Sequence, residues 1–478
     1  MATSAGRTDR RAWGVLLVLC GAIFLEGIDV AMLNVALPAI RADLGLSTGM
    51  LSGVVSAYVL GYGGFMLLGG RAADLLGRRR MFLLGLVVFL AFSGLGGLAS
   101  EGWLLLVARF VTGVAAAFMT PAGLALATNA FPVGPQRTRA LGVYAGIGAG
   151  GFSLGLVAGG LLASVGWRWV FFAPVILATV ILVAAVVLLR DTTEKVRPTG
   201  GFDLAGALSV TGAMLLLAYG VVRLEHAGEG TGLTVGVFAA GLALVAAFVV
   251  IERRSANPLV RLGILRSGPL VRTNVGALLF LGSFAGFQFM ITLYLQELRG
   301  WTPLQTGLAM LVVAIDMILS PTLTPRLVDR FGHVRVLLGG MLSAVLAYAL
   351  FLPVAPDWTY AAMLPGMLLL GLAFSFAYGP LTMAATDGVD EREHGLAGGL
   401  LYTSMQLGTA LGVSAVTAVS AAAADGAPGS GIGMAAVRHG LVVPVVFAVV
   451  AAIVTAFGVR RGSATSAAPT PVSVTAAA

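Results

Sequence analysis

Long apolar stretches recur along the whole chain and alternate with short polar segments. Fourteen runs of 18 or more mostly apolar residues lie between residues 12 and 459, and each is long enough to cross about 30 Å of hydrocarbon as a helix. Backbone polar groups cannot stay unpaired in lipid, so we expect helices rather than strands of an open sheet. The predicted spans are approximately 12–34, 50–69, 81–99, 103–128, 139–163, 167–189, 203–222, 231–251, 271–293, 303–324, 335–354, 358–383, 395–420 and 438–459.

The composition excludes an ordinary soluble protein. Of the 478 residues, 58% are hydrophobic and 10% are charged, whereas soluble domains carry about 25% charged residues. Cys20 is the single cysteine and the four histidines are scattered over separate loops, so we expect neither disulfides nor a metal cluster. There is no G-x-x-x-x-G-K-[ST] loop, which argues against ATP hydrolysis. The sequence therefore predicts no cofactor and no enzymatic activity.

The distribution of positive charge predicts the topology. Of the 29 Lys and Arg residues, five lie in loops on one side, Arg109 lies inside a span, and the other 23 lie on the side of the N-terminus. Because Lys and Arg accumulate in cytoplasmic loops, we expect a multi-pass protein of the inner cell membrane with both termini in the cytoplasm. The net charge of +8 is then explained by topology and by contact with anionic membrane lipids, and we expect no binding to nucleic acid.

A ten-residue pattern occurs twice. The pattern R-x-x-D-x-x-G-x-x-R is formed after the second span by Arg71, Asp74, Gly77 and Arg80, and 255 residues later, after the tenth span, by Arg326, Asp329, Gly332 and Arg335. The repeat predicts two similar six-helix halves with two helices inserted between them. The alternative has twelve spans, with residues 203–251 on the membrane surface; this segment lacks the charged face of an interfacial helix, which favours fourteen.

The predicted organisation follows from the spans and the repeat. Its parts are a cytoplasmic N-terminus (1–11), an N-terminal six-helix bundle (12–189), a cytoplasmic linker (190–202), two inserted transmembrane helices (203–251), a second cytoplasmic linker (252–269), a C-terminal six-helix bundle (270–459) and a disordered cytoplasmic tail (460–478). The tail is rich in Ala, Ser, Thr and Pro, a composition typical of disorder.

The segment GGRAADLLGRRR at residues 69–80 resembles the cytoplasmic signature of the major facilitator superfamily. The resemblance implies the major facilitator fold, an all-α polytopic membrane protein of two six-helix bundles, here with two inserted helices. It also implies a latch that biases the protein between inward-closed and inward-open states. The latch would comprise Gly70, Arg71, Asp74, Gly77, Arg78 and Arg80, together with Arg326, Asp329, Gly332 and Arg335 of the second copy. Alternatively, Arg78 to Arg80 only anchor the topology.

The first span carries two carboxylates. The segment IDVAMLNVALPAI at residues 28–40 contains Asp29 and resembles the first-helix motif of the drug:proton antiporters with fourteen spans. A carboxylate within a span costs about 2.5–3.5 kcal/mol, and Glu26 lies on the same helical face three residues earlier. Two acids this close do not both ionise easily, so we expect this pair to exchange protons.

Two further ionisable residues lie inside spans. Arg109 and Gly113 match the family's R-x-x-x-G pattern in the fourth span, and the resemblance implies that Arg109 takes part in proton coupling. Because a guanidinium stays protonated, the alternative is that Asp29 is its permanent ion-pair partner. Asp316 lies near the middle of the tenth span, where the second half has no other ionisable group. It is a candidate for carrying a proton or for pairing with a charged substrate.

The fifth span is rich in glycine. Its glycines resemble the glycine-rich signature of the superfamily's antiporters, although Leu156 stands where a proline is expected. The glycines that match are Gly142, Gly151, Gly155, Gly159 and Gly160. Close packing of membrane helices also uses glycine, so a purely structural role is the alternative.

By correspondence with the family, spans one, four, nine and twelve line the substrate cavity. This correspondence, together with the acid of span ten, nominates as substrate contacts Asn34, Met119, Phe287, Gln288, Asp316 and Tyr378. Aromatic and Met side chains fill the core of any helix bundle, and core packing is the alternative for Met119, Phe287, Gln288 and Tyr378.

These features predict a monomeric drug:proton antiporter. We expect it to export a hydrophobic, cationic small molecule by alternating access, with protons as the coupling ion and membrane lipids as its surroundings. Three alternatives remain: a dedicated self-resistance exporter of one natural product, a solute importer of the same superfamily, and a membrane receptor. No folded soluble domain is predicted that could relay a signal, which disfavours the receptor.

Overall fold

The computed structural model describes residues 2–131, 135–189, 203–223, 231–255, 263–264, 267–387, 389, 394–423 and 433–465, and all regular structure in them is helical. The first six helices are α1 (Ala2–Leu44), α2 (Thr48–Leu76), α3 (Arg78–Gly97), α4 (Gly102–Asn129), α5 (Pro135–Val165) and α6 (Trp169–Leu188). Two more follow, α7 (Leu204–Arg223) and α8 (Thr231–Arg254). The rest are α9 (Gly268–Leu293), the π-helical η3 (Tyr294–Leu298), α10 (Pro303–Met310), the 3-10 helical η4 (Leu311–Ile315), α11 (Asp316–Thr322), α12 (Thr324–Phe331), α13 (His333–Ala349), α14 (Tyr360–Thr386), α15 (His394–Ala422) and α16 (Met434–Thr465).

The helices have the lengths and composition of membrane spans. Within the described residues, twelve are long and apolar enough to cross a bilayer, and two further apolar helical segments, Ala205–Leu217 and His333–Ala349, are shorter. Many large apolar side chains point outward, for example Val165 at 74% and Val187 at 73% exposure. Such a surface suits lipid rather than water. The predicted all-α polytopic membrane protein is therefore confirmed, and twelve of its fourteen predicted spans are long and apolar enough to cross a bilayer.

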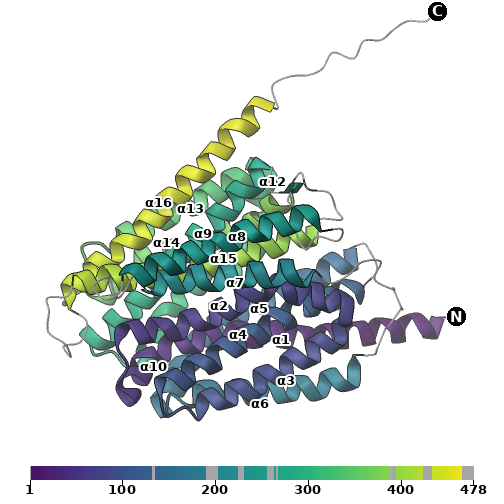
Figure 1. Ribbon diagram of the computed structural model, residues 1–478, viewed down its shortest axis with the longest axis horizontal. Coiled ribbons are helices and arrows are strands. Elements are labelled where there is room, and N and C mark those ends of the chain that lie inside the picture. The colour runs from purple at the N-terminus through teal and green to yellow at the C-terminus, as the bar shows by residue number, and fades with distance from the viewer. Residues whose placement is uncertain are drawn as a thin grey trace, which may run out of the picture.

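The helices form two groups with an inserted pair (Figure 1). Helices α1 to α6 pack mainly against one another, and so do α9 to α16. The groups meet where α2 packs against α15, α5 against α10 and α1 against α9. Helices α7 and α8 pack together as a pair, and α7 touches both α2 and α15, with the Thr211 hydroxyl donating to the Gly64 carbonyl over 2.7 Å. The inserted pair therefore lies against both groups.

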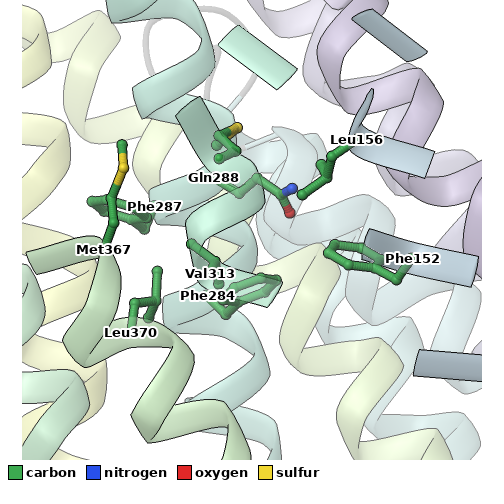
Figure 2. Close-up of a pocket in the computed structure, with 9 residues that line it drawn as sticks. Phe152, Leu156, Phe284, Phe287, Gln288, Val313, Met367 and Leu370 are labelled. Atoms are coloured by element: carbon green, nitrogen blue, oxygen red, sulfur yellow. The ribbon is translucent and has the colours of Figure 1, made fainter. Parts of the chain in front are cut away.

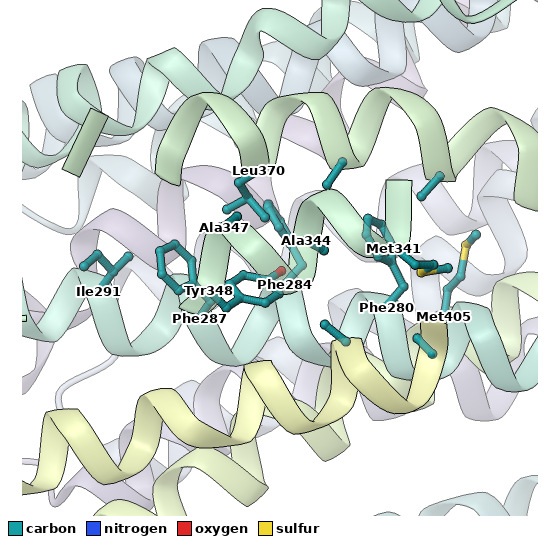
Figure 3. Close-up of a cluster of buried hydrophobic side chains, with 14 of the residues drawn as sticks. Phe280, Phe284, Phe287, Ile291, Met341, Ala344, Ala347, Tyr348, Leu370 and Met405 are labelled. Atoms are coloured by element: carbon teal, nitrogen blue, oxygen red, sulfur yellow. The ribbon is translucent and has the colours of Figure 1, made fainter. Parts of the chain in front are cut away.

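One large hydrophobic cluster fills the second group (Figure 3). Phe287 of α9 lies at its centre, with its ring centroid 5.2 Å from that of Tyr348 and 4.9 Å from that of Phe351. Figure 3 shows Phe280, Phe284 and Phe287 following one face of α9 toward α13. A helix that is apolar on all sides buries whichever face its neighbours cover, so this core depends on how the helices are rotated.

Three segments differ from the predicted spans. Helix α1 begins at Ala2 and continues to Leu44, beyond the predicted residues 12–34. The tenth span is not one helix, because a 3-10 turn separates α10 from α11. Helix α12 begins anew at Thr324 with Pro325 in its first turn, and a proline lacks the N–H that a continuous helix would need. Helix α16 runs to Thr465, so residues 460–465 of the predicted disordered tail are helical. The predicted linker 190–202 lies outside the described residues.

The repeated sequence pattern produces the same backbone turn twice. Gly77 joins α2 to α3 with φ at +101°, and Gly332 joins α12 to α13 with φ at +80°. Residues with a Cβ atom rarely adopt such backbone angles. The glycine of each copy is therefore required by the turn itself, before any role in a latch is considered.

Prediction for the repeated turn. Gly332→Ala should destabilise the protein by about 1–3 kcal/mol, because alanine must adopt the strained positive φ. Gly339→Ala is the matched control, since it also adds a methyl group into open space but lies within helix α13. Thermal unfolding of the detergent-solubilised variants measures both. Equal unfolding midpoints for the two variants would contradict the prediction.

Candidate functional site

A buried ion pair joins the first and fourth helices. Arg109 Nη1 of α4 lies 2.6 Å from Asp29 Oδ2 of α1, and each side chain is 2% exposed. The guanidinium also lies over the ring of Tyr58, 4.4 Å from its centroid. A charge that is removed from water is tolerated only when it is paired and hydrogen-bonded. The pair therefore neutralises Asp29 in this conformation, as the ion-pair alternative for that residue predicts.

Gly113 allows this arrangement to form. A methyl group at Gly113 would overlap the Tyr58 carbonyl oxygen, so only glycine lets α4 approach α2 this closely. Gly113 lies one helical turn after Arg109, and the close approach brings the Tyr58 ring over the guanidinium. The R-x-x-x-G spacing thus has a packing explanation.

Glu26 has a different environment from Asp29. Its carboxylate accepts a hydrogen bond of 2.7 Å from the Thr120 hydroxyl of α4, and its side chain is only half-buried. Among the described residues, no Arg, Lys or His forms an ion pair with it. The buried Tyr62 hydroxyl interacts with the Glu26 carboxylate and with the Thr120 hydroxyl. The structure therefore separates the two acids, one paired with arginine and one surrounded by neutral groups.

Tyrosines gather around Glu26. The carboxylate interacts with Tyr62 of α2 and, at longer range through its charge, with tyrosines of α5, α14 and α15. Five of the nine tyrosines of the chain belong to this region, namely Tyr58, Tyr62, Tyr144, Tyr378 and Tyr402. Only Tyr378 was predicted from the sequence. A tyrosine inside an apolar span has a hydroxyl that needs a partner, and this signal could have found the others.

An apolar cavity lies between the two helix groups (Figure 2). It is small, with a volume of about 20 Å³, which is room for about one water molecule. Its lining consists of Phe152 and Leu156 of α5, Phe284, Phe287 and Gln288 of α9, Met310, Val313, Met367 and Leu370. Figure 2 shows the Gln288 amide pointing toward Leu156. The structure thus brings the predicted Phe287 and Gln288 to a cavity that both groups line.

The cavity is closed at the loop end opposite the termini. Arg41, near the end of α1, forms a 3.0 Å ion pair with Glu297 of η3, and the two side chains are 22% and 16% exposed. Next to this pair, Gln296 donates a hydrogen bond of 2.8 Å to the Val35 carbonyl. A methyl group at Gly160 would lie 2.6 Å from the Pro303 carbonyl oxygen. We call Arg41, Glu297, Gln296 and Val35 the closure cluster.

The π-helical turn positions the closure cluster. In η3 the chain makes wider turns than an α-helix, and such turns often occur at functional sites. On its other side Tyr294 donates a hydrogen bond of 2.6 Å to the Ala355 carbonyl, and Arg299 contacts the Trp358 carbonyl. The turn is therefore anchored to the second group while Gln296 and Glu297 reach the first.

The remaining predicted residues lie elsewhere. Met119 is 1% exposed and packs against Gly85 of α3, and the Asn34 amide donates to the Val30 carbonyl of its own helix over 2.9 Å; these contacts favour packing roles. Asp316 is half-buried at the start of α11, which packs against α14, α12 and α5.

The glycine motif and the latch residues are placed as follows. Gly151, Gly155 and Gly159 lie against the backbone of α1. Gly70 and Arg71 are on α2, Arg78 and Arg80 on α3, Arg326 and Asp329 on α12, and Arg335 on α13. The side chain of Asp74 and the surroundings of Gly142 lie outside the described residues. In the described part of the chain, no group of three His, Cys, Asp or Glu residues could hold a metal ion.

The chain is similar to known resistance, export and transport proteins. Residues 19–413 match the family described as the Major Facilitator Superfamily. A puromycin resistance protein from Streptomyces alboniger is 33% identical over 95% of this chain and 92% of its own length. A cephamycin export protein from Amycolatopsis lactamdurans is 32% identical over 89% of each chain. Among solved structures, the POT family transporter PepTSo superposes with a TM-score of 0.68 at 16% identity, covering 95% of this chain and 98% of that one.

Prediction for the buried pair. Arg109→Leu leaves the Asp29 carboxylate buried without a partner and should lower the free energy of unfolding by about 3–5 kcal/mol. Asp29→Asn added to Arg109→Leu should recover most of that loss, because no unpaired charge remains. Chemical denaturation of the purified protein measures both. Arg168→Leu, which breaks an exposed pair with Asp43, is the control and should cost much less; an equal loss would contradict the prediction.

Proposed function

The chain belongs to the Major Facilitator Superfamily, and on this basis we propose that it exports hydrophobic, cationic small molecules in exchange for protons. The observation that carries the proposal is the environment of Glu26. Its carboxylate lies in the middle of a membrane span, beside polar neutral groups and without a cationic partner among the described residues. A carboxylate in such a place is stabilised either by a proton or by a positively charged substrate.

Competition between proton and substrate for one carboxylate amounts to antiport. When the site faces one side of the membrane, a proton neutralises Glu26; when it faces the other side, the substrate's positive charge displaces that proton. An ionised Glu26 with neither proton nor substrate is unfavourable in a low-dielectric site, whichever side the site faces. The site therefore tends to change sides only when it is occupied. Asp29 and Arg109 form the neighbouring charged pair, and the position of Arg109 sets how strongly the carboxylates attract a proton.

The energetics limit what one acid can do. Exchange of one proton for one monovalent cation moves no net charge, so the driving force is about 1.4 kcal/mol per pH unit. A second titrating acid would add about 2.3 kcal/mol per 100 mV of membrane potential. Asp29, once released from Arg109, and Asp316 are the candidates for that second proton.

Alternating access is the proposed mode of transport. With both termini in the cytoplasm, as the Lys and Arg distribution indicates, the closure cluster lies at the external end, and this conformation is closed to the outside. The ion pair between Arg41 and Glu297 has to break for release of the substrate. The repeated loops around Gly77 and Gly332 lie at the opposite end, where we propose that they act as the inward latch. We propose a monomer in contact with membrane lipids.

A dedicated exporter is the second candidate function. The puromycin resistance and cephamycin export proteins are each named for a single antibiotic, and each matches most of this chain. A protein with that role would use the same acid and the same exchange. The difference lies in the breadth of the substrates and not in the mechanism.

Prediction for transport. Inverted membrane vesicles with an acidic interior should accumulate a fluorescent lipophilic cation, and collapse of the pH gradient should abolish the accumulation. Glu26→Gln should abolish most of the gradient-driven accumulation, because a glutamine side chain cannot bind and release the proton. The control is Glu101→Gln, an exposed acid in a loop, which should transport like the wild type. Accumulation that persists without the gradient, or in Glu26→Gln, would refute proton-coupled export through this residue.

Prediction for the closure cluster. With Cys20→Ser as the background and Leu156→Cys as a reporter in the cavity, a membrane-impermeant maleimide added to intact cells should label slowly. Glu297→Arg places two like charges together and should raise the labelling rate several-fold, since like charges repel at this distance. The exchange Arg41→Glu with Glu297→Arg should restore slow labelling. No change in rate with Glu297→Arg, or no recovery in the exchanged variant, would show that the pair does not hold the outside closed.

A further inference from the structure

We infer that the outer surface of α6 binds one anionic phospholipid, with an acyl chain in an apolar groove and the phosphate at arginines beside the end of the helix that we assign to the cytoplasm. This site lies outside the path between the two helix groups, and the inference does not depend on which compound is transported. Two features that meet at one place define the ligand class, an apolar groove along the helix and positively charged guanidinium groups at its end.

The groove runs along one face of α6. Its volume is about 550 Å³, and it is lined by Thr179, Val180, Val183, Ala184, Val187 and Leu188. The three valines of this face are each more than 60% exposed. The Thr179 hydroxyl donates to the Val175 carbonyl of its own helix over 2.8 Å, so its polar group is already satisfied. Figure 1 shows α6 along the edge of the first helix group, and this apolar face is therefore one that lipid covers.

The groove has the length of one leaflet of a bilayer. Its lining begins at Thr179, near the middle of α6, and ends at Leu188 in the last turn. With a rise of about 1.5 Å per residue, this stretch is about 14 Å long. That length is close to half of the hydrocarbon thickness of about 30 Å. An acyl chain can therefore lie along the groove from the head-group region to the centre of the bilayer.

Two arginines from other helices reach the end of the groove. Arg79 Nε of α3 donates to the Leu189 carbonyl over 2.7 Å, and Arg11 Nη2 of α1 donates to the Leu188 carbonyl over 3.3 Å. Leu188 also lines the groove, so the cations and the apolar surface are adjacent. The exposed Arg80 follows Arg79 in the first turn of α3. Arginine suits the recognition of phosphate, and basic pockets on the cytoplasmic side bind anionic head groups.

The positive charge here exceeds what the end of the helix requires. Carbonyls in the last turn of a helix lack partners within it, and this explains the hydrogen bonds that Arg79 and Arg11 make to α6. In the described part of the chain, neither Arg11 nor Arg80 forms an ion pair with a carboxylate. Their charge therefore remains available at the end of the groove, and a lipid phosphate is the membrane group that complements it.

The second copy of the repeated turn lacks this arrangement. Arg79 lies two residues after Gly77, whereas Val334 lies two residues after Gly332. Val334 packs against Gly458 of α16, the last helix of the second group, as Arg79 contacts the last helix of the first group. The same turn and the same helix contact thus form with an uncharged residue. Neither of them accounts for the arginine of the first copy, which an anionic ligand at α6 does.

Lipid binding to the delipidated protein in detergent, followed by native mass spectrometry, tests the charged end of the site. One dioleoylphosphatidylglycerol should bind at least about fivefold more tightly than dioleoylphosphatidylcholine, and Arg80→Gln should weaken it about fivefold, the contribution of one basic residue near the membrane surface. Arg11→Gln combined with Arg80→Gln should weaken it about thirtyfold. Arg335→Gln is the matched control, because it removes an exposed arginine three residues after Gly332, the place that Arg80 has after Gly77. It should bind the lipid like the wild type.

A second pair of variants tests the groove. Val183→Trp fills the groove with a larger side chain and should weaken phosphatidylglycerol binding about tenfold, the effect of about two methylene groups losing their contact. Ile176→Trp adds the same ring at an exposed position of α6 outside the groove and should leave binding unchanged. Both positions face outward, so both variants should fold. Glycerol 3-phosphate has the phosphate without the chains and should not displace the lipid even in large excess.

Four results would each overturn the lipid site. They are equal affinity for phosphatidylcholine and phosphatidylglycerol, an equal loss in Arg335→Gln and Arg80→Gln, equal effects of the two tryptophan variants, and displacement of the lipid by glycerol 3-phosphate. The binding measurement needs neither a gradient nor a transported compound. Failure of gradient-driven accumulation in vesicles therefore leaves this site standing, and failure of the binding pattern leaves proton-coupled export standing.

Discussion

The cost of keeping charge away from water governs the interior of this protein. Asp29 and Arg109 are both 2% exposed and 2.6 Å apart, so each removes the penalty that the other would otherwise carry. The Tyr58 ring adds a further contact to the guanidinium. Because Arg109 is engaged in this pair, Glu26, three residues before Asp29, has hydroxyl groups beside it instead of a positive charge among the described residues. The same interaction that stabilises the first helix group therefore leaves Glu26 without a cationic partner among the described residues.

Close helix packing shapes the region between the two helix groups. Gly151, Gly155 and Gly159 let α5 lie directly on α1, which fixes the wall that carries Phe152. Gly160 lets the same helix approach α10 of the second group. In lipid there is no strong hydrophobic drive between helices, so they associate through close packing. Small residues allow the backbones to approach closely enough for this packing. The glycine-rich helix thus supports both the wall of the apolar cavity and the closed end.

The inserted helices occupy a position that touches both groups. Helix α7 packs on α2 and α15, the two helices that carry Tyr62 and Tyr402. Its Thr211 is hydrogen-bonded to the backbone of α2, and a hydrogen bond between helices stabilises their association where water is absent. Any relative movement of the two groups therefore has to be accommodated at this contact as well as at the closure cluster.

The sequence by itself determined the membrane architecture, the acids within it and the repeated turn. These features are local: the length of an apolar run predicts a span, a carboxylate inside it is identified by position alone, and the positive φ at Gly77 and Gly332 requires glycine. The tertiary structure alone decided that Arg109 pairs with Asp29 and not with Glu26, and that the tenth span is broken. Those outcomes depend on the rotation and depth of helices far apart in the chain, and helices that are apolar on every face do not encode which side meets which neighbour.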